Sequence, residues 1–287
     1  MKKNFFCVAA LLVIILLSMK SFAFTTTGFQ DPYGIAVDEK TGYIYVSNIN
    51  GGYDQRDGNG FISRLNKDGK VDTMRYIGGT SKGVALNSPK GMEIVEGKIY
   101  IADLNQLRVY DLKLARFLYN INFGDYLIRH LIDVTTGPDG AIYVTDGPAN
   151  TIYRVDVKMQ HEVTVFASGD FLGQPHGICW YPARELFVVA GWNSGQLIEF
   201  DKSGKQQVLP AVSANTIEGC AVDTFGNTYI SSESLDVVFK VAHNFAMYGF
   251  ALGQQSPVGL AYRKDDQQLM VVSLDANSVQ SFKVESE

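Results

Sequence analysis

The sequence contains few of the residues that build reactive or metal centres. Among its 287 residues are three cysteines, four histidines and two tryptophans. It has no H-E-x-x-H, C-x-x-C or phosphate-loop pattern, which excludes the usual signatures of zinc proteases, thioredoxin-like redox sites and P-loop nucleotidases. It also lacks a basic stripe, because 25 Lys and Arg stand against 30 Asp and Glu, so we predict no nucleic-acid partner.

The N-terminal apolar run, Phe5–Leu17, is too short to cross a bilayer, which takes about 20 residues. It follows two lysines and precedes small residues at Ser21 and Ala23. A basic start, a short apolar core and a cleavage site are typical of a secretory signal peptide. We predict a signal peptide over residues 1–23, a secreted or periplasmic protein, and no membrane span after cleavage. An uncleaved anchor is the alternative.

After the leader, one unit recurs six times. Each copy has a Pro-x-Gly-like turn and then three short apolar or β-branched runs, bounded by Gly, Asn and Asp. The aligned turn positions are Gly34, Gly91, Asp133, Gly177, Gly219 and Gly259. Four of the five intervals lie between 40 residues (Gly219 to Gly259) and 44 residues (Asp133 to Gly177). This period is typical of four-stranded propeller blades.

The repeats predict an all-β fold, a six-bladed β-propeller with four antiparallel strands per blade. A fourth apolar run follows each of the first five copies, whereas the chain ends at Glu287 before the sixth copy has one. We therefore predict that Phe24–Phe29 supplies the missing outer strand beside Ser278–Val284 and closes the ring. Residues 24–287 then form one domain, which we expect to be a monomer, with blades starting near residues 31, 88, 131, 174, 216 and 256.

The first copy carries P-x-G-I-x-V-D at Pro32–Asp38, G-x-I-Y-V-x-N at Gly42–Asn48, and then a strand ending near K-x-G. These motifs resemble the NHL-repeat propellers. More loosely, the chain is similar to the senescence-marker-protein/gluconolactonase and strictosidine-synthase-like families. The resemblance covers the chain after the leader and implies the fold, while unrelated activities share that fold.

With four antiparallel strands per blade, the chain enters every inner strand from the same face of the disc. The residue before each aligned position is therefore expected at the mouth of the central channel. These ring residues are Tyr33, Lys90, Ile132, His176, Glu218 and Val258. His176 and Glu218 lie on consecutive blades, and an imidazole beside a carboxylate can begin a Ca²⁺, Mg²⁺ or Zn²⁺ site or act as a catalytic acid–base pair. The alternative is that both side chains only hold water at the mouth.

The gluconolactonase resemblance implies metal ligands at these same positions, a Glu in the first blade, Asn in the third and fourth, and Asp in the fifth. Here the positions hold Tyr33, Ile132, His176 and Glu218, so one carboxylate remains. Ca²⁺ requires six to eight oxygen ligands, which this ring does not supply unaided. The sequence also contains Pro-His-Gly-Ile at Pro175–Ile178, a turn found in propeller lyases related to NHL proteins.

Further candidates lie on loops of the same face. The polar insert Ile49–Gly60 is a rim loop or lid, and its Asp54, Asp57 and Asn59 match part of a calcium loop. The segment Gly124–Leu131 brings Arg129 and His130 toward the mouth, where they can bind an anionic group. Trp192 lies on a mouth-side turn and can stack on a ligand.

Two cysteines follow the leader, Cys179 and Cys220, on the inner strands of neighbouring blades. They lie one residue out of phase in the repeat, so their side chains point to opposite faces of their own blades. They can therefore face each other across one blade interface. They form a disulfide or remain two small buried hydrophobic residues.

Two functions remain open at this point. The first is a binding module whose mouth face takes a protein, peptide, glycan or small molecule. The second is a metal-dependent hydrolase or lyase that works through His176 and Glu218, with Arg129 or Lys90 steadying an anion. The lack of a complete catalytic set favours the first, and the clustering of ionisable groups on one ring favours the second.

Overall fold

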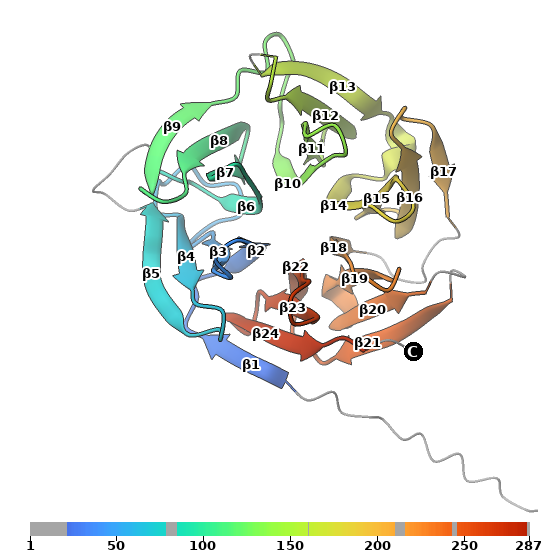
Figure 1. The fold of residues 1–287 in the computed structure, drawn as a ribbon. Coiled ribbons are helices and arrows are strands. Elements are labelled where there is room, and N and C mark those ends of the chain that lie inside the picture. The colour runs from blue at the N-terminus through green and yellow to red at the C-terminus, as the bar shows by residue number, and fades with distance from the viewer. Residues whose placement is uncertain (1–21, 79–84, 160, 210–215, 243–245, 286–287) are drawn as a thin grey trace, which may run out of the picture.

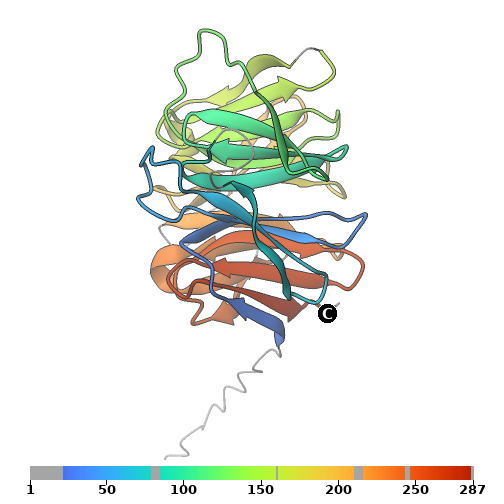
Figure 2. The same cartoon turned by 90° about the vertical axis from the view of Figure 1, so that its left-hand side faces the viewer.

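The computed structural model describes residues 22–78, 85–159, 161–209, 216–242 and 246–285. Within them, 24 strands form six four-stranded antiparallel sheets arranged as blades around a central axis (Figure 1). The edge-on view shows loops projecting from both faces of the disc (Figure 2). The predicted fold, a six-bladed propeller of four-stranded blades, is confirmed.

The first three blades run outward from the channel in chain order. Blade 1 comprises β2 (Pro32–Val37), β3 (Ile44–Asn48), β4 (Phe61–Leu65) and β5 (Val71–Gly78). Blade 2 comprises β6 (Pro89–Val95), β7 (Lys98–Asp103), β8 (Gln106–Asp111) and β9 (Arg116–Asn120). Blade 3 comprises β10 (Leu131–Thr136), β11 (Ile142–Asp146), β12 (Thr151–Asp156) and β13 (Glu162–Ser168).

The other three blades follow the same order, with short 3-10 turns η1 (Asp170–Leu172) and η2 (Glu233–Leu235). Blade 4 comprises β14 (Pro175–Tyr181), β15 (Leu186–Gly191), β16 (Gln196–Asp201) and β17 (Gln206–Val208). Blade 5 comprises β18 (Ile217–Val222), β19 (Thr228–Ser232), β20 (Val237–Val241) and β21 (Met247–Leu252). Blade 6 comprises β22 (Pro257–Arg263), β23 (Gln268–Ser273), β24 (Ser278–Lys283) and β1 (Phe22–Thr27).

The N-terminal strand β1 closes the ring as predicted. It pairs antiparallel with β24, from Phe24 opposite Ser281 to Thr27 opposite Ser278 (Figure 1). The observed strand starts two residues earlier than expected and ends at Thr27, while Phe29 is buried in the core cluster between blades 6 and 1. Pairing the first strand with the last removes an exposed sheet edge on each.

The hydrophobic core is divided among the blade interfaces. Each of six buried clusters lies mainly between two neighbouring blades, for example Tyr45 and Ile62 of blade 1 with Ile99 and Ile101 of blade 2. The alternating apolar residues of each strand face these interfaces because successive side chains of a strand point to opposite sides. The packing therefore fixes the angle between blades and hence the position of the inner strands.

The aligned glycines lie inside the inner strands and not at turns, which corrects the interpretation from the sequence. A Cβ on Gly177 would stand 2.3 Å from the carbonyl oxygen of Glu218, and one on Gly219 would stand 2.2 Å from that of Val258. Glycine is required there because the backbones of neighbouring inner strands approach closely. Asp133 takes this position in blade 3, with its Oδ1 2.2 Å from the Cβ position of Gly91.

The predicted signal peptide, residues 1–23, lies almost wholly outside the described residues. Within the described ranges, no helix is long and apolar enough to cross a membrane.

Candidate functional site

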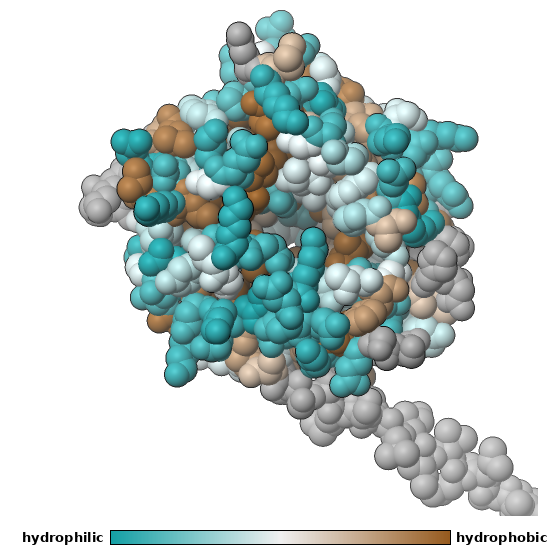
Figure 3. All heavy atoms as spheres, viewed as in Figure 1, coloured by the Kyte–Doolittle hydropathy of each residue, from teal (hydrophilic) through white to brown (hydrophobic). Residues whose placement is uncertain are grey.

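A cavity of about 320 Å³ lies at one mouth of the central channel. Five of the six predicted ring residues line it: Tyr33, Ile132, His176, Glu218 and Val258. Figure 3 shows the opposite face of the disc, which is also hollowed at its centre, where the inner strands converge. The sixth ring residue, Lys90, is fully buried beside the cavity.

A β-bulge turns each ring residue toward the channel. In all six inner strands the register with the second strand shifts across the ring residue and the position after it, as between Pro175 and Ile178 in blade 4. A bulge re-aims the side chains at its site, and bulges are frequent next to active sites. Hydroxyl groups satisfy the displaced backbone: Ser231 Oγ accepts a hydrogen bond from the amide of Gly219 at 2.8 Å.

His176, Glu218 and Tyr33 form one buried hydrogen-bonded group. Glu218 Oε2 lies 2.7 Å from His176 Nδ1 and 2.7 Å from the Tyr33 hydroxyl. Each of the three residues is at most 7% exposed. Burial and the neighbouring Glu218 raise the pKa of Tyr33 well above its usual value, so its phenol stays protonated and donates to the carboxylate.

This arrangement sets the orientation of the imidazole. A carboxylate accepts hydrogen bonds, so Glu218 favours the tautomer that carries its proton on Nδ1. Nε2 then holds the lone pair of the ring, and it has no hydrogen-bond partner among the described residues, while His176 lines the cavity. A histidine held by a carboxylate on one nitrogen and free on the other is the arrangement of a general base.

The surroundings hold the ring in place. Trp192 stacks on His176 with ring centroids 5.4 Å apart and an interplanar angle of 16°. Thr145 Oγ1 donates to the carbonyl of His176 at 2.8 Å. A Cβ at Gly147 would stand 3.3 Å from His176 Nε2, so a side chain there would crowd the free nitrogen. The imidazole is therefore positioned from both sides before any ligand binds.

Asp133 stands in the throat below this cavity. Its Oδ2 accepts a hydrogen bond from the amide of Ile178 at 3.0 Å, which ties blade 3 to the strand that carries His176. Burial raises the pKa of Asp133 to about 6, and the contact with Ile178 opposes that rise. The throat it lines has a volume of about 30 Å³, so the channel narrows sharply there.

A second buried network lies beside the cavity. Lys90 Nζ is 2.6 Å from His130 Nε2, 2.8 Å from Ser88 Oγ and 3.2 Å from the carbonyl of Tyr53. Burial lowers the pKa of Lys90 to about 7. Burial and the Lys90 charge lower the pKa of His130 to about 3. At neutral pH His130 is therefore uncharged, and the positive charge of the pair stays on Lys90 when the pair is protonated.

The polar insert of blade 1 covers this network. The Tyr53 ring lies 3.8 Å from Lys90 Nζ and 5.0 Å from the His130 ring. Asp54 Oδ1 is 2.8 Å from His130 Nδ1. The expectation of a rim loop over the mouth agrees with this position. Asp54 pairs with His130 here, and Asp57 Oδ1 accepts from the amide of Asn59 at 3.3 Å.

Several residues sit differently from the sequence-based expectation. Arg129 is exposed and does not line the cavity, whereas His130 and Trp192 do. Sequence reasoning missed Tyr53, Gln174 and Glu233, which also line it. They come from mouth-side loops, where only the predicted blade geometry could have indicated them. Burial raises the pKa of Glu233, and the neighbouring Glu218 adds to the rise.

The donor set does not match a complete metal centre. Among the described residues, no group of three or more His, Cys, Asp or Glu is arranged to hold an ion. His176 and Glu218 supply two donors and already bond to each other. A catalytic zinc site uses three protein ligands, and Ca²⁺ takes six to eight oxygens. Among the described residues, the metal site predicted at His176 and Glu218 therefore lacks a fitting set of ligands.

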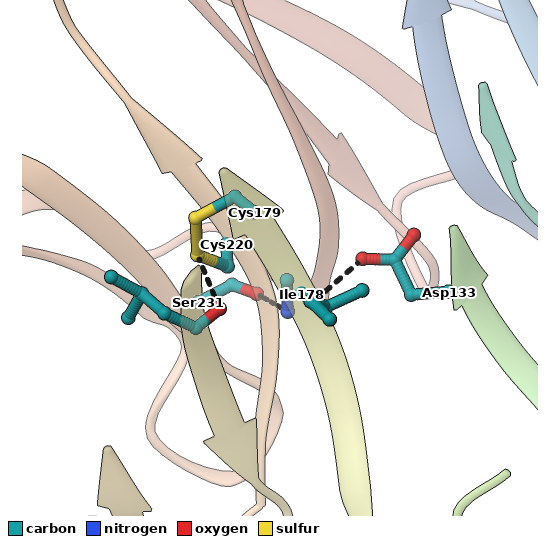
Figure 4. The surroundings of a disulfide bond; sticks show 7 residues. Asp133, Ile178, Cys179, Cys220 and Ser231 are labelled. Atoms are coloured by element: carbon teal, nitrogen blue, oxygen red, sulfur yellow. Dashed lines mark hydrogen bonds between the residues drawn. A yellow bond between two sulfur atoms is a disulfide. The ribbon is translucent and has the colours of Figure 1, made fainter. Parts of the chain in front are cut away.

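The opposite end of the channel opens into a chamber of about 290 Å³. Cys179 of β14 and Cys220 of β18 line it and are joined by a disulfide, with Cα atoms 5.7 Å apart (Figure 4). Figure 4 also shows the contact of Asp133 with the Ile178 backbone in the same region. The bond links blades 4 and 5, the two blades that carry His176 and Glu218.

No protein-family model matches the sequence, and no curated protein matches it significantly. Solved structures do match. A virginiamycin B lyase from Staphylococcus aureus has a TM-score of 0.67 at 14% identity, over 91% of this chain and 99% of its own. A gluconolactonase from Xanthomonas campestris has a TM-score of 0.71 at 14% identity, over 91% and 89%.

A protein of unknown function from Bacteroides thetaiotaomicron is also similar, with a TM-score of 0.69 at 14% identity over 93% of this chain and 73% of that one. At such identities the likeness establishes the fold alone. The chain is thus a six-bladed β-propeller whose structural neighbours include propeller lyases and gluconolactonases.

Proposed function

We propose that the chain is an enzyme that uses His176 as a general base at the channel mouth. One observation carries this: Glu218 holds Nδ1 of a cavity-lining histidine at 2.7 Å, while Nε2 has no hydrogen-bond partner among the described residues. A histidine that only held water at the mouth would not need a buried carboxylate on its far nitrogen. Positioned proton transfer of this kind contributes about 10²- to 10⁴-fold to a rate.

The cavity suggests the substrate and the reaction. Its wall includes Tyr33, Tyr53 and Trp192 together with Ile132, Val258 and Leu274, which suits a largely apolar, ring-containing small molecule. Within the described part of the chain no Ser, Thr or Cys lines it, so a covalent acyl intermediate has no hydroxyl or thiol nucleophile among these lining residues. His176 would instead take a proton from carbon, with loss of a leaving group, as in a lyase.

Hydrolysis is the second reaction that this base supports. His176 would then take a proton from water, which attacks an ester or lactone carbonyl. The gluconolactonase neighbours favour this reaction, and the lyase neighbours favour elimination. We place elimination first because it needs only the base that the structure supplies and a leaving group, whereas hydrolysis also needs a positioned water.

The earlier binding-module hypothesis stays as a second candidate function. It is favoured by the aromatic lining of the cavity and by the absence of a three-donor metal set among the described residues. The bound molecule would be a protein, peptide, glycan or small molecule held at the mouth. We also propose export through the N-terminal leader to the periplasm or outside the cell, where an inter-blade disulfide is stable.

The experiment is a turnover screen read by mass spectrometry. Its substrates are quinupristin, which is present in a structure of an inactive virginiamycin B lyase from Staphylococcus aureus, gluconolactone, and a panel of cyclic esters. Elimination leaves the summed product mass equal to that of the substrate, whereas hydrolysis adds one water. We expect His176→Ala and Glu218→Ala to lower turnover by about 10²- to 10⁴-fold. His161→Ala is the matched control, since His161 contacts Tyr119 at the outer part of the disc. Turnover that survives in His176→Ala, or a ligand that binds and stays unchanged, would contradict the proposal.

A further inference from the structure

A second hollow lies on the disc away from the channel. It has a volume of about 420 Å³ and lies between the turn that joins β7 to β8 and the segment that follows β9. We call it the amide groove, because Asn105, Gln106, Asn120 and Asn122 line it. Apart from the phenol of Tyr126, none of its lining residues has an ionisable side chain.

The amides are available to a ligand. Asn120 and Gln106 make no side-chain hydrogen bond among the described residues, and Asn120 is exposed. Asn122 Oδ1 accepts from the amide of Gly124 at 2.9 Å, which leaves its NH₂ group free to donate. Asn105 Oδ1 accepts from Arg56 at 2.8 Å and likewise keeps its NH₂ group. The groove therefore presents several neutral donors and acceptors together.

An aromatic platform stands beside these amides. Tyr126 is 42% exposed, and its ring packs against Tyr153 with centroids 5.3 Å apart. Phe123 packs against the same Tyr153 ring at 5.4 Å, so the base of the platform is anchored in the core between blades 2 and 3. Leu127 is 76% exposed at the lip. Exposed apolar surface fixed in this way is a place for a ligand to stack.

We propose that the amide groove binds a neutral oligosaccharide. Vicinal sugar hydroxyls each donate and accept, which matches the paired donors and acceptors of side-chain amides. The apolar face of a sugar ring suits the open face of Tyr126. A phosphorylated or carboxylated ligand would call for a cation in the groove, and a cationic ligand for a carboxylate, and the lining provides neither.

The blade 1 insert contacts both the groove and the channel mouth. Arg56 bonds to Asn105 in the groove, while Tyr53 of the same insert lines the cavity. A saccharide in the groove would thus lie beside the loop that covers Lys90 and His130. The inference does not depend on the proposed enzymatic function, because it rests on different residues and on binding alone.

The experiment is isothermal titration of the full mature protein with maltohexaose, cellohexaose, laminarihexaose and chitohexaose. We expect binding of at least one of them, with an affinity that stays constant between mildly acidic and mildly alkaline pH and across salt concentrations, because no charged group contributes. Tyr126→Ala and Asn120→Ala should each weaken binding by about tenfold, roughly the loss of one good contact. Tyr126→Phe should retain it.

Tyr248→Ala is the matched control, since Tyr248 is an exposed tyrosine as well, at 55%, but lies on β21 of blade 5. Asn120→Ala removes an exposed side chain that supports no neighbour, so loss of folding does not obscure its result. Heat with none of the four sugars, unchanged affinity in Tyr126→Ala and Asn120→Ala, or binding that weakens with salt would overturn the proposal. Binding of an uncharged peptide in place of the sugars would also overturn it.

Discussion

Removing the inter-blade disulfide should lower the stability of the mature protein by a predictable amount. The bond between Cys179 and Cys220 closes a loop with a sequence separation of 41 residues. In the chain-entropy treatment, a cross-link over a loop of this size disfavours the unfolded state by about 4 kcal/mol at 25 °C. For a chain of this length that corresponds to a fall in Tm of about 8 °C.

The change is the double substitution Cys179→Ala with Cys220→Ala, which leaves no unpaired thiol in the mature chain. Both side chains are nearly fully buried, so the variant also loses a small amount of packing. Thermal unfolding is followed by circular dichroism with and without a reductant. The wild type should melt at the variant's temperature once reduced, whereas the variant should not respond to reductant.

The reasoning is refuted if the double variant melts within about 1 °C of the wild type, because the loss of a cross-link over this loop should lower Tm by much more than that. It also fails if a thiol assay of the unfolded, unreduced mature protein counts two free thiols. In that case the cysteines would be two buried hydrophobic residues.

Deleting Phe24–Phe29 should lower Tm sharply in a melting experiment, because it removes the β1–β24 pairing that closes the ring. Gly177→Ala should cost about 1–3 kcal/mol in denaturant unfolding, because the new Cβ stands 2.3 Å from the Glu218 carbonyl oxygen. Lys90→Met should change how stability depends on pH. The folded pKa of Lys90 is lowered to about 7, against about 10.4 when unfolded, so the unfolded state binds more protons between these values. Wild-type unfolding free energy should therefore rise with pH from about 7 to 10, and the variant should lose that rise.

Each of these expectations has an opposing result. A deletion variant as stable as the parent would show that the ring does not need β1. A Gly177→Ala variant with unchanged stability would mean that β14 and β18 can separate freely. Equal slopes of stability against pH in the wild type and Lys90→Met would show that Lys90 titrates in the folded protein as it does in the unfolded chain.

The fold followed from the sequence because repeats are a local signal. Three apolar runs per copy and the orphan segment Phe24–Phe29 were enough to predict the blades and their closure. The ring residues also followed, since each lies next to the aligned glycine. What the sequence did not show was why glycine recurs: the cause is close approach of neighbouring inner strands at a bulge, which depends on residues about 42 positions away, as from Gly177 to Gly219.

The site was predicted only in part, because only some of its residues belong to the repeat. His176 and Glu218 belong to the repeat and could be placed by counting strands. Tyr53 and Glu233 reach the cavity from loops whose paths depend on tertiary packing. Lys90 has a ring position, yet the blade 1 insert folds over it and holds it out of the cavity. Insert length is visible in a sequence, but the direction in which an insert folds is not.

The central claim is that His176 presents an unprotonated Nε2 to the cavity, with Nδ1 donating to Glu218. Nitrogen-15 NMR of the imidazole in mildly alkaline buffer measures this directly, and a His176→Gln variant assigns the signal. The account predicts the Nδ1–H tautomer in the wild type and its loss in Glu218→Leu, whose side chain cannot accept the hydrogen bond that Oε2 accepts from His176. A wild-type imidazole with its proton on Nε2, or a tautomer unchanged by Glu218→Leu, would contradict the account.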